Sequence, residues 1–314
     1  MTCCRFPGND GILNINKPRG RTSFSIVAVV RHLTGEKRVG HAGTLDPMAS
    51  GVLPVCIGQA TRLVEYMMEA GKTYHAVIEL GITTDTYDSE GKILARTDAS
   101  HISRSQVEAT LAQFRGEIEQ TAPAYSAVKH QGAPLYKMAR AGIAVPLKKR
   151  RVRVDRIELT KWQPPVFTLE IDCGKGTYVR AIAHDLGQVL GCGAYLKDLV
   201  RLRCGVFGIS DALTPEELEN AFRTGYWQEL LYPLDSVLTG LPAVVVSTEN
   251  EKAVCSGKTI NIEGVPPEAK LCRAYNECGN LLAVLKMDAS SGLWHPEKVF
   301  ATLTLPAPCD TNIR

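Results

Sequence analysis

The order of helix-like and strand-like segments is the feature of this 314-residue sequence that most constrains its fold. Residues 11–18 alternate apolar and polar side chains, as a half-buried strand does, and run into a basic turn that ends at Gly20. An amphipathic helix is predicted over 24–33, with Thr22 and Ser23 as capping residues and Gly35 at its end. The chain therefore begins with a strand followed by a helix.

Later segments continue this mixture without an internal repeat. Strand patterns are predicted at 52–58, 73–82, near 150–160 and at 166–173. A capping box at Ser103 precedes a helix that ends at Gly116, another helix is predicted at about 178–190, and a third follows Thr214 with Pro215 at its first position. Because strands and helices alternate irregularly, the pattern favours an α+β fold over a doubly wound parallel sheet.

The pattern changes beyond Leu241. Short apolar segments, AVVVS, LCRAYN and LLAVLKM, are separated by turns that contain Gly, Pro or Asn, and no long helix is predicted after Glu251. We therefore expect a large domain over residues 1–239 and a small β-rich domain over residues 240–314.

Composition and charge narrow the class of protein. The formal net charge is only +3, so a polyanionic partner has to be inferred from clusters of basic residues. The ten cysteines are scattered, form no C-x-x-C pair and follow no signal peptide, which indicates reduced thiols rather than a disulfide framework. No stretch approaches the roughly 20 apolar residues that a membrane helix needs. These features predict a cytoplasmic protein without membrane association.

The segment VGHAGTLDPMASG at 39–51 is too rich in Gly and Pro for a regular element and predicts a loop. Pro47 biases the backbone of Asp46 away from the α region, and Gly43 allows a close approach of the backbone. The loop is therefore suited to presenting the Asp46 carboxylate, with His41 five residues before it. An ordinary turn with a surface histidine has the same spacing.

Two further segments carry side chains that suit a reaction on a nucleobase. Gly176 and Thr177 are expected to start a helix, which places Arg180 in its first turn, where the helix dipole disfavours a cation. Asp46 is the expected partner, and Arg180 would then lower the pKa of Asp46 and keep it ionised. Tyr74, at the start of a predicted strand, is suited to stack on a base. An exposed Arg180 and a core Tyr74 are the alternatives.

Basic residues are densest in the run KKRRVR at 148–153, and a second group lies near position 20. Such side chains position RNA through phosphate contacts that do not read sequence. A solvated charge run at a strand edge is the alternative. The candidate contacts to RNA phosphates are Lys17, Arg19, Lys148, Lys149, Arg150 and Arg151.

Two other groups of residues are set aside. Asp85 and Asp88 offer too few ligands for a metal site, so no metal is expected. Cys173 and His184 have no third group to orient them, which argues against a thiol nucleophile.

Five segments, taken in order, resemble the TruB family of tRNA pseudouridine-55 synthases over roughly residues 11–210. They are ILNINKPRGRTS, VGHAGTLDPMASGVLPVCIGQATR, KTYHAVIELGITTDTYDSEG, PAYSAVKHQGAPLYKMARAG and CGKGTYVRAIAHDLGQVLGCGAYLKDLVRL. Five motifs in the family's order with similar gaps do not arise by chance, so they outweigh the alternatives given for each segment alone.

The resemblance implies a pseudouridine synthase fold, with a mixed and mainly antiparallel sheet, and a small C-terminal RNA-binding domain of the PUA type. By motif it identifies Asp46 as the catalytic nucleophile, Tyr74 as the stacking tyrosine and Arg180 as the basic partner of the aspartate. It implies that His41 helps to displace the target base.

The resemblance also implies that Tyr178 and Leu199 line the uridine pocket. The sequence after Leu199, VRLR at 200–203, departs from the family's usual basic pair, so the resemblance does not specify this wall of the pocket.

The implied activity is the isomerisation of uridine 55 in the T-loop of tRNA, without a cofactor. The implied partner is the T-arm of tRNA. A monomer without an obligatory protein partner is the default expectation for the oligomeric state. Asp46 would attack either C6 of the flipped uracil or C1′ of the ribose, and the base that removes the C5 proton is unassigned. The alternatives are a non-catalytic chaperone that binds tRNA through the same surface, and a guide-RNA-dependent synthase within a multi-protein particle.

Overall fold

The computed structural model describes residues 9–121, 123, 129–130, 133–134 and 149–300. Its largest element is a nine-stranded sheet, with a main path in the order β1-β3-β12-β4-β11-β10-β7, β2 added to β3 and β13 added to β12. These strands are β1 (Gly11–Lys17), β2 (Val39–His41), β3 (Ser50–Ile57), β4 (Lys72–Leu80), β7 (Gly116–Thr121), β10 (Lys149–Gln163), β11 (Val166–Cys173), β12 (Ala194–Cys204) and β13 (Phe207–Gly208).

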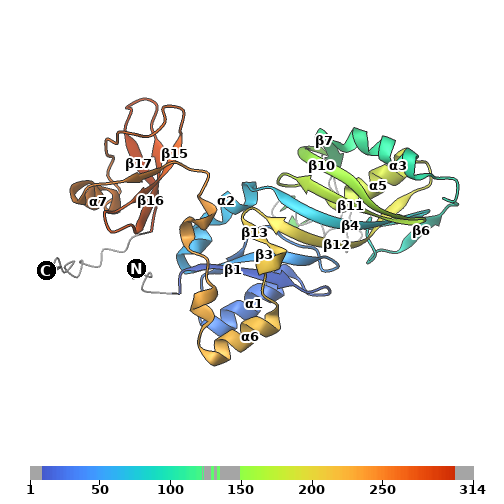
Figure 1. Ribbon diagram of the computed structural model, residues 1–314, viewed down its shortest axis with the longest axis horizontal. Helices are drawn as coiled ribbons and strands as arrows, with labels where there is room; N and C mark the ends of the chain where they lie inside the picture. The colour runs from blue at the N-terminus through green and yellow to red at the C-terminus, as the bar shows by residue number, and fades with distance from the viewer. Residues whose placement is uncertain (1–8, 122, 124–128, 131–132, 135–148, 301–314) are drawn as a thin grey trace.

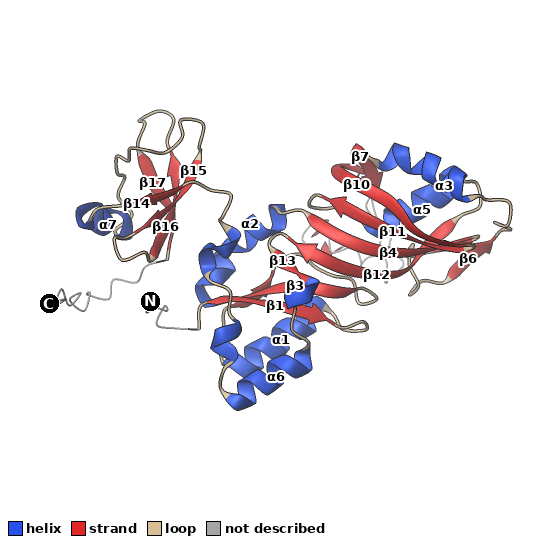
Figure 2. Cartoon of the chain, viewed as in Figure 1, coloured by secondary structure: helices blue, strands red, loops and turns tan. Residues whose placement is uncertain are grey.

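Helices and smaller sheets complete the fold (Figure 2). The helices are α1 (Ser23–Thr34), α2 (Val64–Glu69), α3 (Arg104–Leu111), α5 (Val179–Val189), α6 (Pro215–Thr224) and α7 (Thr248–Cys255). Two-stranded sheets pair β5 (Ile82–Thr84) with β6 (Ile93–Arg96) and β8 (Lys129–His130) with β9 (Ala133–Pro134), and a four-stranded sheet contains β14 (Ala243–Val245), β15 (Leu271–Tyr275), β16 (Leu281–Met287) and β17 (Trp294–Val299). Within the residue ranges described, none of the helices has the length and apolar character needed to cross a membrane.

The main sheet is mixed and mainly antiparallel, as the resemblance to the TruB family implies. Along its main path every neighbouring pair is antiparallel except β3 and β12, which run parallel where Ser50 lies opposite Val200 and Gly51 opposite Arg201. Helices α1 and α6 lie at the β1 end of this sheet, whereas α5 packs mainly on β12 and α3 packs on β10 (Figure 1). The predicted α+β class is confirmed.

Local signals in the sequence explain several helix boundaries. The Thr22 side chain accepts a hydrogen bond from the backbone at the start of α1, and Gly35 adopts the left-handed conformation at its end. Capping boxes begin α3 at Ser103 and α6 at Thr214, where Pro215 occupies the first helical position. These predictions are confirmed.

Other elements depend on partners distant in the sequence. The predicted loop at 39–51 begins instead with strand β2, because its first three residues pair with β3. Strand β12 was not predicted, although it lies between β4 and β3 in the middle of the sheet. Helix α7, which begins after the capping residue Ser247, was also not predicted.

The C-terminal sheet has an apolar core of its own and a contact with the larger part of the chain. Val254, Cys272 and Trp294 belong to its core, whereas Val284 and Phe300 share a second apolar cluster with side chains from β1 and β3. A predicted domain boundary at residue 240 is consistent with this arrangement and stays a prediction.

The parallel junction of β3 and β12 requires a residue without a side chain at position 51. Gly51 has φ +101°, and a Cβ atom there would lie 2.3 Å from the backbone oxygen of Arg201. A larger residue would therefore be strained by its backbone conformation and would also push the two strands apart.

We expect Gly51→Ala to lower the free energy of unfolding by about 3 kcal/mol, because backbone strain and overpacking add. The matched control is Gly225→Ala, which also has positive φ but meets no atom within 4 Å; it should cost about 1 kcal/mol. Urea denaturation of both variants measures the difference, and equal losses would argue that the strands can separate without cost.

Candidate active site

The loop that carries Asp46 is tied to the start of helix α1. The Ser23 hydroxyl donates a hydrogen bond to the backbone oxygen of Leu45 (3.1 Å) and accepts one from its backbone nitrogen (2.9 Å). On the other side of Asp46, the backbone oxygen of Pro47 accepts a hydrogen bond from the nitrogen of Gly20 (2.8 Å). The backbone on both sides of Asp46 is therefore fixed by bonds to residues 20–23.

Lys17 supports the same loop from the end of β1. Its side chain is completely buried, and its ammonium group donates hydrogen bonds to the backbone oxygens of Pro18 (3.0 Å), Arg21 (2.6 Å) and Pro47 (3.5 Å). Burial lowers the pKa of Lys17 to about 8. The prediction that Lys17 contacts an RNA phosphate is wrong, because its charged group faces the interior and is already bonded.

Arg201 is a third support that the sequence did not reveal. The residue is 1% exposed, and its guanidinium donates to the backbone oxygens of Val52 (2.6 Å) and Gly43 (3.1 Å). The Tyr74 side chain is a further hydrogen-bond partner of this guanidinium. No element was predicted for residues 194–204, and nothing in their sequence indicated that Arg201 would be buried and would hold the loop.

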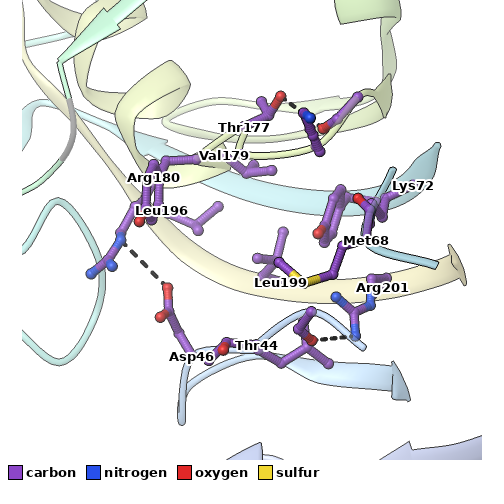
Figure 3. A pocket seen from close by; sticks show the side chains of 17 residues that line it. Thr44, Asp46, Met68, Lys72, Thr177, Val179, Arg180, Leu196, Leu199 and Arg201 are labelled. Carbon is purple, nitrogen blue, oxygen red and sulfur yellow. Dashed lines mark hydrogen bonds and ion pairs between the residues drawn. The ribbon is translucent and has the colours of Figure 1, made fainter. Parts of the chain in front are cut away.

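A cavity of about 240 Å³ opens beside Asp46. This volume is below the roughly 300–1,000 Å³ of pockets for drug-sized ligands, and it suits one nucleobase. In Figure 3, Arg180 faces Asp46, Leu196 lies near Arg180, and Leu199 lies next to Met68. The cavity is lined by Gly43–Asp46, Met68, Lys72, Tyr74, Gly174–Arg180, Leu196, Leu199 and Arg201.

The structure brings Arg180 and Asp46 together, with a second carboxylate on the same guanidinium. Arg180 lies in the first turn of α5, and no acidic residue of that turn accompanies it. Its Nε atom is 3.4 Å from Asp46 Oδ2, and its Nη1 atom is 3.3 Å from Asp88 Oδ2. The side chains of Arg180 and Asp88 are 5% and 4% exposed, whereas that of Asp46 is 34% exposed. Of these three side chains, which form the Asp46–Arg180–Asp88 trio, only that of Asp46 is substantially exposed.

The electrostatics of Asp46 differ from the expectation. Burial of the carboxyl group raises the pKa of Asp46 above the usual value, and this effect outweighs the lowering by Arg180. The negative charge of Asp88 also raises the pKa of Asp46, and Lys17 lowers it. The predicted lowering of this pKa is therefore wrong, because Arg180 divides its charge between two carboxylates inside a desolvated pocket.

The other predicted site residues are distributed around this centre. Tyr74 on β4 and Leu199 on β12 are both nearly buried and line the cavity, as does Tyr178 at the start of α5. His41, at the end of β2, is half-buried and does not line the cavity. Burial lowers the pKa of His41, with a further lowering by the nearby Arg201, so the imidazole is uncharged at neutral pH.

The predicted basic contacts have different surroundings. Arg19 pairs with Asp198 (3.4 Å) and Lys149 with Glu119 (2.7 Å), while Arg151 is exposed. The guanidinium of Arg150 lies over the Tyr178 ring, 4.9 Å from its centroid, which links the basic run to the cavity wall. Lys148 lies outside the described residues, as do most residues of the fourth resemblance segment at 123–142.

The rejected thiol pair remains unsupported. Cys173 is buried, and burial raises the pKa of its thiol to about 11, so a reactive thiolate is disfavoured. His184 stacks on Tyr87 instead, with ring centroids 3.8 Å apart.

Comparison with known proteins decides the family. Residues 31–179 match the model of the TruB family pseudouridylate synthase N-terminal domain, and residues 180–239 match that of the tRNA pseudouridylate synthase B C-terminal domain. The chain belongs to the TruB family of pseudouridylate synthases. The family predicted from the five motifs is confirmed, and with it the class of enzyme.

Relatives of this TruB-family synthase cover almost its whole length. A protein named tRNA pseudouridine synthase B from Dehalococcoides mccartyi is 47% identical over 292 residues, which are 93% of this chain and 96% of that protein. One of the same name from Clostridium kluyveri is 41% identical over 278 residues, 88% of this chain and 94% of that protein. Among solved structures, a chain in the crystal structure of a Cbf5-Nop10-Gar1 complex is 26% identical with a TM-score of 0.68, covering 88% of this chain and 78% of that one.

We expect Arg201→Met to lower the free energy of unfolding of this synthase by about 3 kcal/mol, because two buried carbonyl groups lose their donor. Backbone amides at 42–49 should also exchange hydrogen faster. The matched control is Arg203→Met on the same strand, where the side chain is 48% exposed and pairs with Asp172 at 3.7 Å; its loss should be below about 1 kcal/mol. Unchanged hydrogen exchange at 42–49 in Arg201→Met would show that the hydrogen bonds from Ser23 and Lys17 are enough to hold the loop.

Proposed function

We propose that this TruB-family synthase converts uridine 55 in the T-loop of tRNA to pseudouridine, with Asp46 as the nucleophile. The observation that carries the proposal is the position of Asp46: its partly exposed carboxylate faces a cavity of nucleobase size and pairs with the buried Arg180. The relatives named tRNA pseudouridine synthase B support tRNA as the substrate. The position within tRNA follows from the family.

The cavity lies within the protein wall, so the target uridine has to leave its stack in the T-loop to reach Asp46. The Asp46 carboxylate then forms a covalent bond to the substrate, at C6 of the uracil or C1′ of the ribose. The N1–C1′ bond breaks, the uracil rotates within the cavity, and a C5–C1′ bond forms. Loss of the C5 proton, gain of a proton at N1 and release of Asp46 complete an isomerisation that needs no cofactor.

Tyr74 suits a role in holding the base rather than in proton transfer. Burial raises the pKa of Tyr74 to about 12, and its side chain is hydrogen-bonded to Arg201. The phenol therefore stays protonated at neutral pH. Its ring, on β4, and the Leu199 side chain, on the neighbouring β12, provide two walls against which a pyrimidine can pack.

The His41 side chain lies outside the cavity lining, on the strand that leads into the Asp46 loop. This location suits a group that occupies the space left by the displaced base rather than one that touches it in the pocket. The half-buried, uncharged imidazole would enter a stack of bases without the cost of desolvating a charge.

The RNA partner is bound by a single chain without an obligatory protein partner, in the cytoplasm. Phosphate contacts come from Arg19, Lys149, Arg150 and Arg151, and from Lys148. The four-stranded sheet within residues 240–314 serves as the PUA-like RNA-binding domain, and residues 1–239 form the catalytic domain. This division is supported by the separate apolar core of the C-terminal sheet.

Asp46→Asn should abolish pseudouridine formation in an unmodified tRNA transcript while tRNA binding remains, because the amide is not a nucleophile. The control Asp211→Asn changes an exposed carboxylate on a short turn and should behave as wild type. Mapping pseudouridine to the nucleotide, with the purified chain alone, makes the measurement.

The alternatives predict different outcomes in that assay. If the wild-type chain and Asp46→Asn both bind tRNA tightly and neither modifies it, the non-catalytic tRNA chaperone is favoured. Modification only after a guide RNA is added would favour the guided synthase.

The pH dependence of the reaction should shift in Asp88→Asn. The ionised form of Asp46 is required, and the negative charge of Asp88 raises the pKa of Asp46. Removing that charge lowers this pKa, so the acidic limb of the single-turnover rate profile should move to lower pH. The control Asp85→Asn, in the same loop, should leave the limb in place. A limb that moves to higher pH would contradict the proposed electrostatics.

A further inference from the structure

Tyr87 adopts a backbone conformation that tyrosine normally avoids. Among the described residues it is the only non-glycine residue with positive φ, at 67°. The left-handed region is unfavourable for a residue with a Cβ atom, and such conformations persist where the surroundings hold them. Tyr87 directly precedes Asp88, the second carboxylate on Arg180.

The surroundings hold Tyr87 through its ring and its backbone. The ring stacks on His184 of α5, with centroids 3.8 Å apart and planes at 15°. The Tyr87 backbone oxygen accepts a hydrogen bond from the nitrogen of Leu196 on β12 (2.9 Å). His184 Nδ1 is buried without a hydrogen-bond partner among the described residues, so the imidazole contributes at this place by packing.

Tyr87 and Asp88, which are consecutive in the loop between β5 and β6, contact two residues of helix α5. Arg180 and His184 are four residues apart on α5 and therefore lie on one face, one turn from each other. Tyr87 and Asp88 are consecutive, and each contacts one of them, through the ring stack and the ion pair. The loop is thus attached to α5 at two points one turn apart.

The Asp88 carboxylate is oriented by its own loop so that one oxygen is left for Arg180. Its Oδ1 atom accepts hydrogen bonds from the Thr86 hydroxyl (2.5 Å) and the backbone nitrogen of Glu90 (3.1 Å). Its Oδ2 atom lies against Arg180. A shift of the loop at Tyr87 would therefore move Asp88 Oδ2. The Arg180 guanidinium would follow it, and the distance between Arg180 and Asp46 would change.

We propose that the stacked pair of Tyr87 and His184 is a positioning device for the reaction: it holds Asp88, and through Asp88 it fixes Arg180 beside Asp46. This inference rests on the proposed function of Asp46 as nucleophile. Neither ring touches the cavity, since neither residue lines it. Both are positioning residues that act through the ion pairs of Arg180.

The test separates the ring from the backbone conformation. Tyr87→Gly removes the ring and adopts positive φ freely, Tyr87→Asn removes the ring with a residue that tolerates this conformation, and Tyr87→Phe keeps the ring. On the helix, His184→Ala removes the stack and His184→Phe restores an aromatic ring. Single-turnover rates on an unmodified tRNA transcript and the Kd for tRNA are measured for all five.

We expect the variants that lack a ring to react about 10- to 100-fold more slowly, as small displacements of a catalytic group do, with the Kd unchanged. The two phenylalanine variants should retain rates close to wild type. In an Asp88→Ala background, Tyr87→Gly should cause no further loss, because the pair acts through Asp88. Full rates without the rings, or equal losses in both backgrounds, would overturn the proposal.

A second measurement does not depend on activity. Hydrogen exchange at the Nε–H group of Arg180, observed by NMR and assigned by its loss in Arg180→Lys, should be faster in Tyr87→Gly and His184→Ala than in Tyr87→Phe. Equal exchange in all variants would refute the positioning role even if the wild-type chain formed no pseudouridine. If the wild-type chain forms no pseudouridine but the exchange at Arg180 follows the expected pattern, the proposed function of Asp46 is contradicted. The positioning role of Tyr87 and His184 is then still supported.

Discussion

The buried guanidinium of Arg201 at the junction of β3 and β12 is the interaction on which the rest of the site depends. A charged group with almost no exposure is tolerated only when its donors are bonded, and here the acceptors are backbone oxygens of Val52 and Gly43. The two strands approach closely because Gly51 has no side chain. The sheet junction, the start of the Asp46 loop and Tyr74 are therefore fixed together by one side chain.

A second buried guanidinium sets the electrostatics of the cavity. Arg180 contacts Asp46 and Asp88, so the trio carries one more negative charge than positive charge when both carboxylates are ionised. This imbalance and the burial of the carboxyl group explain why the pKa of Asp46 is raised rather than lowered. Ionised Asp46 is thus less stabilised than in an isolated ion pair, which suits the role of nucleophile that we propose for it.

The basic surface is less positive than the run KKRRVR suggests. Lys149 pairs with Glu119, and Arg153 pairs with Asp155 on its own strand. Arg150 lies over the ring of Tyr178, which lines the cavity. Neighbouring carboxylates therefore limit non-specific attraction to polyanions, and the remaining charge lies close to the site.

The sequence by itself determined the family of this chain and several helix boundaries. Capping residues such as Thr22 and Thr214 specify helix starts through bonds to nearby backbone. Asp46, Tyr74 and Arg180 were predicted as site residues from their motifs, and all three line one cavity. Only the tertiary structure decided that Lys17 is buried, that the strand β12 forms between β4 and β3, and that Asp88 shares Arg180 across 92 positions of sequence. Burial and long-range pairing depend on which segments meet in space, and so the sign of the Asp46 pKa shift, which burial controls, could not be obtained from the motifs.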